Sequence, residues 1–383
     1  MPLDFTRSWS NEELDLLRDT VARFLDTEVV PDDAPARQRG YVDRQLWNKA
    51  GALGLLCIDI PEEYGGGGGD FRHESAVHDE MGLRGLTGMN IGVHSITAHY
   101  ILNHGTEAQK KKYLPKMASG ELVGAIAMTE PGAGSDLQGV RTRAEKQADG
   151  SYLINGSKTF ITNGFLAGLI VVVCKTDPDQ GARGTSLLII ETENCPGFKV
   201  GRLLDKVGMR SQDTSELFFD DVRVPGDALL GGVEGQGFFQ LMSDLPYERT
   251  LLAVGALGSM EGAYQATLEY VRERKAFGQP VAQFQNTRFQ LAEVATEITV
   301  GRAFVDRCVE RLAAGTLDTA TASMAKLWAS EAQGRVVDKC LQLFGGYGYM
   351  NEYLIARMYA DARIQRIYGG TNEIMKELIS RHL

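Results

Sequence analysis

The chain has 383 residues, a formal net charge of −10 and a hydrophobic fraction of 43%. This length exceeds the size at which one hydrophobic core usually keeps growing, so the sequence predicts two or three domains. The acidic balance argues against a nucleic-acid partner, which needs a basic surface, and no run of about 20 apolar residues could span a bilayer.

Cysteine usage and the N-terminus indicate the compartment. The five cysteines are Cys57, Cys174, Cys195, Cys308 and Cys340. They form no C-x-x-C pair, and no histidine lies at zinc spacing from them. Residues 1–5 show no charged-then-apolar leader. These features predict a cytoplasmic protein with no metal site.

The first third of the chain has helical periodicity. Leu14, Leu17, Val21 and Phe24 recur at intervals of three and four, which indicates an amphipathic helix. Pro31 is predicted to end this helix.

A run of five glycines at residues 65–69 separates two further predicted helices, 46–56 and 71–83. Such a run could bind phosphate, but the Lys-Ser/Thr pair that a P-loop requires does not follow it. We therefore interpret it as a flexible surface loop. Another helix is predicted around Tyr100, and residues 1–122 are predicted to form an all-helical N-terminal domain.

The periodicity changes near residue 123. Residues 140–144 alternate between apolar and polar, and Asp-Gly at 149–150 and Asn-Gly at 155–156 are hairpin signals. Runs rich in β-branched residues predict strands at 169–174, 186–190 and 217–224. We expect a middle antiparallel β domain over residues 123–232.

Helical periodicity returns after Pro246. The predicted helices are 251–274, 294–312, 320–344 and a last one from near residue 371. Long helices with short connections pack as antiparallel neighbours, so residues 233–383 are predicted to form a four-helix bundle. Helices, then strands, then helices indicate an α+β protein with separate layers rather than βαβ units.

Three glycine-containing stretches could hold a phosphorylated ligand. In residues 128–136 (MTEPGAGSD), Gly132 and Gly134 permit close backbone approach, although Pro-Gly is also an ordinary turn signal. The clusters at 345–348 and 369–371 either end helices or lie beside a helix N-terminus that could hold a pyrophosphate. The Rossmann fingerprint, G-x-S-x-G and H-E-x-x-H are absent.

Five motifs resemble those of the acyl-CoA dehydrogenases. They are AMTEPGAGSD (127–136), GSKTFITNG (156–164), ERKAFG (273–278), QLFGGYG (342–348) and RIYGGTNEI (366–374). They stand in the family's order and spacing over nearly the whole chain, which is most similar to the long-chain group. The resemblance implies the family's helix–sheet–helix fold and an FAD-dependent enzyme of fatty acid β-oxidation. Such an enzyme converts an acyl-CoA thioester to trans-2-enoyl-CoA. It passes electrons to an electron-transfer flavoprotein and assembles as a homotetramer, a dimer of dimers.

The resemblance implies a flavin site made of two sets of residues. Those lining the isoalloxazine ring and pyrophosphate would be Met128, Thr129, Gly134, Ser135, Phe160 and Thr162. Those reaching the adenosine-diphosphate half of a neighbouring subunit's flavin would be Arg274, Phe277, Gln285, Gln342, Gly345 and Gly346. Thr371 and Glu373 would close around FAD. From the residues alone, Arg274 could equally be a solvated helix end.

The reaction needs a base for the α-proton while hydride leaves the β carbon for flavin N5. Many family members place a glutamate directly after the tyrosine of the C-terminal motif, where this chain has Gly369. The isovaleryl and long-chain enzymes instead supply the base from the start of a helix, which here implies Glu248. Burial would raise its pKa toward neutrality. Without the resemblance, we would interpret Glu248 as a carboxylate in a first helical turn, where the helix dipole favours negative charge.

The resemblance also implies contacts with the substrate. The residues are Ser135, Phe239, Tyr247, Arg249, Gly369 and Gly370. The backbone N–H of Gly369 would polarise the thioester carbonyl, and Arg249 would pair with the CoA part unless it forms a surface ion pair. Acyl chain length and branching stay open. So do two other functions: an acyl-CoA oxidase that uses oxygen, and a catalytically silent binding or assembly protein with this fold.

Overall fold

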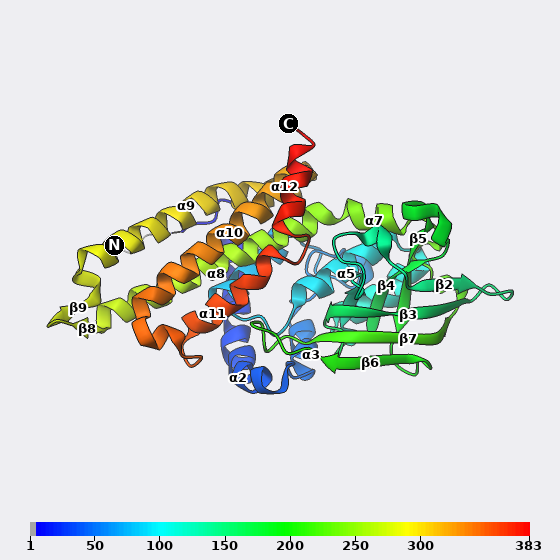
Figure 1. Cartoon of the computed structure of the whole chain (residues 1–383), viewed down its shortest axis with the longest axis horizontal. Coiled ribbons are helices and arrows are strands. Elements are labelled where there is room, and N and C mark those ends of the chain that lie inside the picture. The colour runs from blue at the N-terminus through cyan, green and yellow to red at the C-terminus, as the bar shows by residue number, and fades with distance from the viewer. Residues whose placement is uncertain (1–4) are drawn as a thin grey trace.

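The computed structural model describes residues 5–383; the first four residues, on which the leader prediction largely rests, lie outside it. Helices form both ends of the chain and a sheet forms its middle, as Figure 1 shows. The predicted α+β class with helical, β and helical parts in that order is confirmed.

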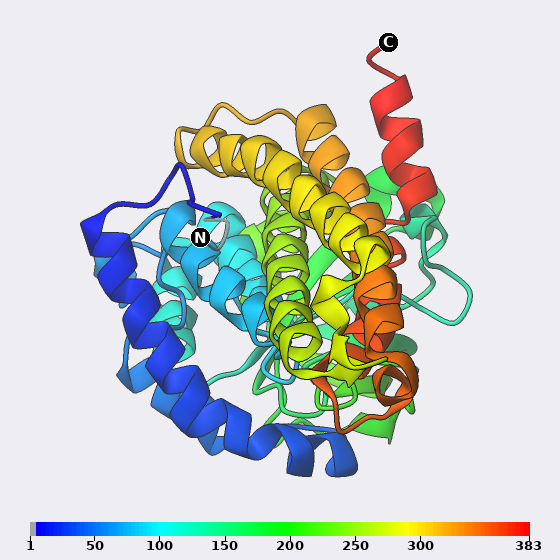
Figure 2. The same cartoon turned by 90° about the vertical axis from the view of Figure 1, so that its left-hand side faces the viewer.

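Within the described residues, six α-helices precede the sheet. They are α1 (Glu12–Phe24), α2 (Val30–Arg39), α3 (Gln45–Ala52), α4 (Phe71–Leu83), α5 (Ile91–His104) and α6 (Glu107–Ala118). The prediction that the first helix ends at Pro31 is wrong. A π-helical turn, Leu25–Val29, joins α1 to α2, and the two follow one long rod in Figure 2. Pro31 is the second residue of α2, directly after this wider turn, where the helical hydrogen-bond pattern changes and a residue without an N–H is tolerated.

The glycine run at 65–69 is a surface loop, as predicted, but it is fixed rather than flexible. The N–H of Gly67 donates to the carbonyl oxygen of Cys57 at 3.2 Å. A Cβ on Gly66 would lie 2.2 Å from the carbonyl oxygen of Ile60. Glycine is therefore required here because the loop packs directly on another backbone segment.

One seven-stranded sheet forms the middle of the chain. Its strands are β1 (Gly124–Ala127), β2 (Arg143–Lys146), β3 (Tyr152–Thr162), β4 (Leu169–Lys175), β5 (Thr185–Glu191), β6 (Phe198–Leu203) and β7 (Thr214–Val224). The order is β1-β4-β2-β3-β7-β6, with β5 paired to β4. Four pairings are antiparallel, but β4 pairs in parallel with both β1 and β2. The sheet is thus mixed rather than wholly antiparallel as expected.

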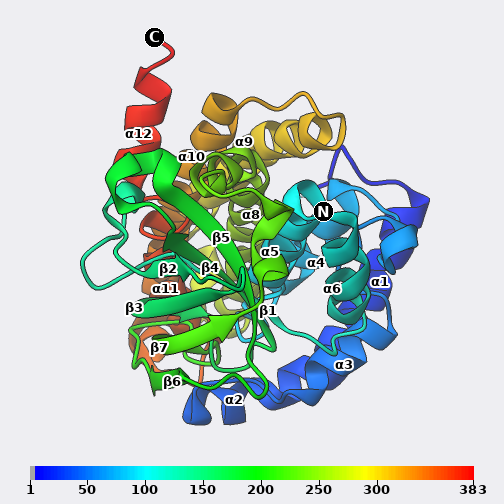
Figure 3. The same cartoon turned by 90° about the vertical axis from the view of Figure 1, so that its right-hand side faces the viewer.

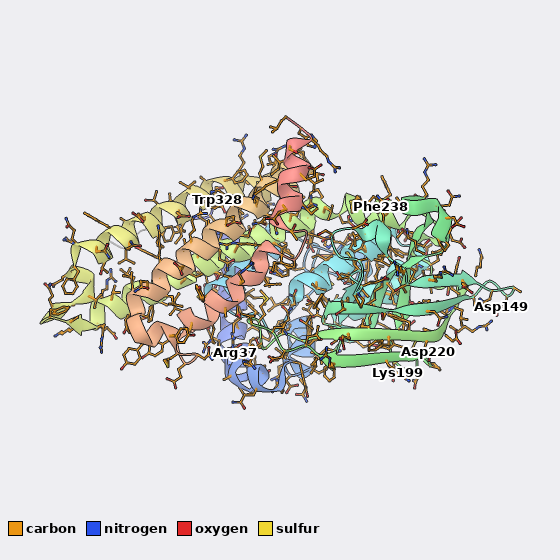
Figure 4. The ribbon with its side chains drawn as sticks, viewed as in Figure 1. Arg37, Asp149, Lys199, Asp220, Phe238 and Trp328 are labelled. Atoms are coloured by element: carbon orange, nitrogen blue, oxygen red, sulfur yellow. The ribbon has the colours of Figure 1, made fainter. Side chains whose placement is uncertain are left out.

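The two predicted hairpin signals have different outcomes. Asp149 and Gly150 form the turn between β2 and β3, and Asp149 lies at the far tip of that hairpin in Figure 4. Asn155 and Gly156 do not turn the chain, so that prediction is wrong. They lie within β3 at a register shift against β7. A Cβ on Gly156 would lie 2.5 Å from Thr142 Oγ1, so this glycine serves a bulge with close approach.

The last part of the chain is helical. Its elements are α7 (Gly237–Ser243), α8 (Leu245–Glu273), a small hairpin of β8 (Lys275–Ala276) and β9 (Gln279–Pro280), α9 (Gln285–Ala313), α10 (Thr319–Phe344), α11 (Leu354–Ala362) and α12 (Asn372–Ser380). The long helices α8, α9 and α10 match the predicted stripes and lie side by side with the shorter α11 (Figures 1 and 2). The spacing of apolar residues did not predict α7, which has seven residues, or α11, which has nine.

The three parts of the chain meet around α5. Figure 3 shows α5 between the sheet and α8, and it contacts both β1 and α8. Side chains from the N-terminal helices, from one face of the sheet and from α8, α9 and α10 form one continuous hydrophobic core. This packing brings the first turn of α8, which contains Glu248, against α5.

Candidate active site

Glu248 lies in the first turn of α8 with 8% of its surface exposed. The hydroxyl of Tyr100, on α5, donates to Glu248 Oε1 at 2.7 Å. Burial raises the pKa of Glu248 to about 7, and the negative charge of Asp244 adds to this effect. A carboxyl group that titrates near neutrality is suited to general base chemistry.

Gly369 lies beside α8, one turn beyond Glu248. Its φ is +62°, and a Cβ there would lie 2.5 Å from Leu252 Cδ1. Residues four apart share one face of a helix, so Leu252 and Glu248 face the same way. The backbone of Gly369 is therefore near Glu248, with no space for a side chain unless its surroundings move.

A buried lysine fixes the loop that contains Gly369. Lys326 Nζ, from α10, donates to the carbonyl oxygen of Gly370 at 2.8 Å and to Asn372 Oδ1 at 3.0 Å. Burial and the charge of Arg249 lower the pKa of Lys326 to about 8. The Gly369–Gly370 backbone is thus held between α8 and α10.

Arg249 is buried, with 3% of its surface exposed, so the alternative of a surface ion pair is wrong. Its Nη1 donates to Ser323 Oγ on α10 at 3.0 Å. Its Nε has no hydrogen-bond partner within residues 5–383. A buried guanidinium nitrogen without an acceptor is costly, so this atom is a donor that a bound ligand could satisfy.

Of the other residues expected to contact the substrate, some lie near Glu248 and some lie at the surface. Tyr247 packs its ring on His99 with centroids 4.1 Å apart, and its hydroxyl donates to Asp59 Oδ2 at 3.0 Å. Phe239 is 70% exposed on α7, and Ser135 is exposed in the loop after β1. The structure therefore groups Tyr247, Arg249, Gly369 and Gly370 around the start of α8, whereas Phe239 points to the surface.

Residues 128–136 contain a tight turn, as one of the two sequence interpretations predicts. The N–H of Glu130 donates to the carbonyl oxygen of Ala133 at 2.9 Å, and the N–H of Ala133 donates back at 3.1 Å. The carbonyl oxygen of Thr129 accepts from the N–H of Thr159 at 2.9 Å, which joins the turn to β3. A Cβ on Gly134 would meet no atom within 4 Å. The outer side of this turn is therefore open to a ligand.

A second buried lysine holds this turn in place. Lys158 Nζ donates to the carbonyl oxygens of Met128 (3.0 Å) and Val173 (2.7 Å) and to Glu130 Oε1 (2.9 Å). The backbone N–H groups of Arg141 and Thr142 also donate to Glu130, at 2.7 and 2.9 Å. Burial opposes the charge on Glu130, but Lys158 and these donors outweigh it and lower its pKa.

Phe160 and Thr162 lie beyond this turn on β3. Phe160 is 66% exposed and has a φ of 60°, a left-handed conformation that is strained for an aromatic residue. Thr162 Oγ1 accepts from Gln212 Nε2 at 3.2 Å. An exposed aromatic ring held by strain next to the open turn favours a ligand surface.

The second expected flavin set lies at the other end of α8. Arg274, Gln342, Gly345 and Gly346 line one hollow of about 590 Å³, and the Arg274 guanidinium lies 5.5 Å from the centre of the Tyr347 ring. Phe277 and Gln285 are exposed nearby but do not line it. Thr371 caps α12 by accepting the N–H of Ile374 at 3.3 Å, and Glu373 is exposed in the first turn of that helix.

Tyr100, Lys158 and Lys326 belong to the site but were not predicted from the sequence. Lys326 is the one charged side chain in the otherwise small and apolar stretch 319–330, a signal that could have marked it. Tyr100 gives no such signal, because its partner is 148 residues away and an aromatic residue in a helical stripe is ordinary core.

Three family models together match most of the chain. The acyl-CoA dehydrogenase N-terminal domain matches residues 11–121, the middle domain matches 125–222 and the C-terminal domain matches 235–383. The fold and the site thus define a flavoprotein oxidoreductase. The chain belongs to the acyl-CoA dehydrogenase family, whose members act on acyl-CoA in fatty acid β-oxidation.

Relatives of several specificities are similar over the full length. The mitochondrial long-chain specific acyl-CoA dehydrogenase of Sus scrofa is 50% identical and covers 97% of this chain and 87% of the relative. The isovaleryl-CoA dehydrogenase of Oryza sativa is 38% identical, covering 96% and 90%. The acyl-CoA dehydrogenase structure from Geobacillus kaustophilus superposes with a TM-score of 0.95 at 47% identity, covering 98% and 99%.

Among residues 5–383, no helix is both long enough and apolar enough to cross a membrane.

Proposed function

We propose that this protein catalyses FAD-dependent α,β-dehydrogenation of an acyl-CoA thioester, with Glu248 as the base that removes the α-proton. The observation that carries the proposal is a buried carboxyl with a pKa near 7 in the first turn of α8. Gly369, at the position where many relatives place the base, has no side chain to offer. Bound FAD would supply the chemistry that the chain lacks, by accepting hydride from the β carbon.

The residues around Glu248 have complementary tasks. Glu248 takes the proton from the α carbon, so negative charge grows on the thioester carbonyl. The N–H of Gly369, held by the contact of Lys326 with Gly370, is proposed to donate to that oxygen. The unpartnered Nε of Arg249 supplies a further donor for the substrate.

The residues near the turn at 128–136 fit a flavin. The outer side of Gly134 is open, the ring of Phe160 is exposed, and the buried pair of Lys158 and Glu130 keeps the backbone of Met128 and Thr129 in place. Such a rigid, partly apolar wall with backbone polar groups suits a planar heteroaromatic ring. These residues would therefore hold the reacting end of FAD.

The hollow beside Arg274 fits the other end of the cofactor, but of a second copy. It combines a guanidinium with the exposed backbone of Gly345 and Gly346, a setting suited to phosphate and ribose. Arg274 follows Glu248 by 26 residues at the opposite end of α8, a separation of roughly 40 Å. This exceeds the length of one dinucleotide. The separation supports the proposed homotetramer, in which each FAD contacts two subunits.

We further propose that electrons leave through an electron-transfer flavoprotein in the cytoplasm. An acyl-CoA oxidase would show itself by hydrogen peroxide release without another acceptor. A silent binding protein would hold FAD, yet no saturated acyl-CoA would bleach it.

The test is anaerobic flavin bleaching by a panel of straight and branched saturated acyl-CoA thioesters. Rapid bleaching by at least one member, with the trans-2-enoyl-CoA recovered, is expected. Because similar proteins include a long-chain specific and an isovaleryl-CoA dehydrogenase, the panel contains both long straight and short branched acyl chains. Absence of bleaching by every member would contradict the proposed reaction.

A further inference from the structure

Tyr100 is a buried side chain whose only described polar contact reaches the proposed base. It lies inside α5 with 0% of its surface exposed. Its hydroxyl donates to Glu248 Oε1 at 2.7 Å, across the packed surface between α5 and α8. Within residues 5–383, no protein group donates to the other carboxyl oxygen, Oε2. The two oxygens of Glu248 are therefore not equivalent.

We propose that Tyr100 is a positioning residue for the reacting carboxylate: its hydroxyl holds Oε1 and leaves Oε2 directed to take the proton. This inference rests on the proposed function, in which Glu248 is the base. A carboxylate held by one hydrogen bond cannot rotate freely, so the geometry of proton transfer is set before substrate binds.

The hydroxyl is suited to this task because it stays protonated. Burial and the charge of Glu248 raise the pKa of Tyr100 well above its ordinary value, so it remains a donor throughout the pH range of an assay. A donor stabilises the charged form of a carboxyl group. The bond thus keeps Glu248 available as a base in a buried place that otherwise favours its neutral form.

Other charged groups also face Glu248 and must stay constant in a test. Asp244, just before α8, raises the pKa of Glu248, while Arg249 lowers it. Asp244 itself accepts from Asn103 Nδ2 and His104 Nε2 on α5, at 2.8 and 3.2 Å. Lys326, on α10, lies close enough to Arg249 for the charge of that guanidinium to lower the pKa of the lysine. A Tyr100→Phe change removes the hydroxyl alone and leaves all of these groups in place.

The chain offers a matched control for Tyr100→Phe. Tyr113, on α6, is also buried, and its hydroxyl donates to Glu191 Oε1 at 3.1 Å. Tyr113→Phe therefore removes the same kind of bond from a carboxylate that is not part of the site. Both variants keep the aromatic ring, so core packing changes little.

The experiment compares FAD-loaded wild-type protein, Tyr100→Phe, Tyr113→Phe and Glu248→Gln. For Tyr100→Phe, kcat at pH 7 should fall by about tenfold with little change in KM. The acidic limb of its kcat–pH profile should move to higher pH, since the carboxylate has lost a donor. Tyr113→Phe should keep the wild-type profile.

Two outcomes separate this inference from the function on which it rests. An unchanged profile and kcat in Tyr100→Phe, with Glu248→Gln inactive, would overturn the positioning role while leaving Glu248 as the base. Full turnover in Glu248→Gln would overturn the proposed function and the positioning role together. The same shift in Tyr113→Phe as in Tyr100→Phe would also overturn the inference, because a general effect of losing a hydroxyl would explain it.

Discussion

Glu130 and Glu248 are two glutamates with nearly equal exposure, 7% and 8%, in regions with different chemistry. Glu130 lies in the turn after β1, where Lys158 and two backbone N–H groups donate to it and its pKa is lowered. Glu248 starts α8, where the donor described for it is Tyr100 and its pKa rises to about 7. The same side chain with nearly the same exposed fraction is thus a fixed ion in one region and a titrating group in the other.

The contrast shows that burial alone does not identify a catalytic carboxylate. Full pairing stabilises the charge and removes the lone pairs that a proton would use. Partial pairing leaves a free oxygen and a pKa near the working pH. Glu130 lies in the motif at residues 127–136, yet its contacts indicate that it stabilises the turn there.

The largest expected effect is the loss of turnover when Glu248, the proposed base, is replaced. Glu248→Gln should lower turnover by about 10²- to 10⁴-fold while FAD stays bound, because an amide cannot take the α-proton. Glu269→Gln is the matched control, since Glu269 is exposed on the same helix. Steady-state turnover and the flavin absorption spectrum are the measurements, and wild-type turnover in Glu248→Gln would exclude it as the base.

The next largest effect is the loss of stability when Lys158, the cation paired with Glu130, is replaced. Lys158→Met should lower the free energy of unfolding by about 3–5 kcal/mol, because it leaves a buried carboxylate without its cation. It should also weaken FAD retention by freeing the backbone of Met128. Urea unfolding and cofactor loss on gel filtration measure the two effects.

A double variant provides the control for Lys158→Met. Adding Glu130→Gln should recover part of the lost stability, since the uncompensated charge is gone. Equal stability of Lys158→Met and wild type would contradict the structural role of the pair.

A smaller effect concerns the free energy of unfolding, which the buried carboxylate of Glu248 lowers at high pH. Its pKa is about 7 in the folded state and near 4.5 when unfolded, so the folded protein holds the proton more tightly and loses stability as pH rises between these values. Glu248→Gln should therefore be more stable than wild type at pH 8, by at most about 3 kcal/mol. The gain should vanish near pH 4, and an equal gain at both pH values would contradict the raised pKa.

Patterns of neighbouring residues in the sequence predicted the helices and turns that depend on those residues alone. The spacing of apolar residues was sufficient for α4 and the long helices of the last third, and Asp149-Gly150 was sufficient for one hairpin. Pro31 and Asn155-Gly156 misled because a proline fits a first helical turn and a glycine fits a bulge. The parallel pairing of β1 with β4 depends on packing between distant segments, which periodicity does not report.

The site was predictable only in part for the same reason. Glu248 followed from a resemblance and from the glycine at position 369, but its pKa depends on the packing of α5 against α8. The partners of Lys158 come from residues 128, 130 and 173, which no spacing rule connects. Long-range hydrogen bonds of this kind require the folded chain.

The most direct test of Glu248 as the base is exchange of the substrate's α-proton with solvent. An acyl-CoA analogue with sulfur in place of the β carbon has an α-proton but no β-hydride to give. In deuterated buffer, wild-type protein and Glu269→Gln should place deuterium on its α carbon, as read by mass spectrometry, whereas Glu248→Gln should not. Exchange by Glu248→Gln at the wild-type rate would contradict the account.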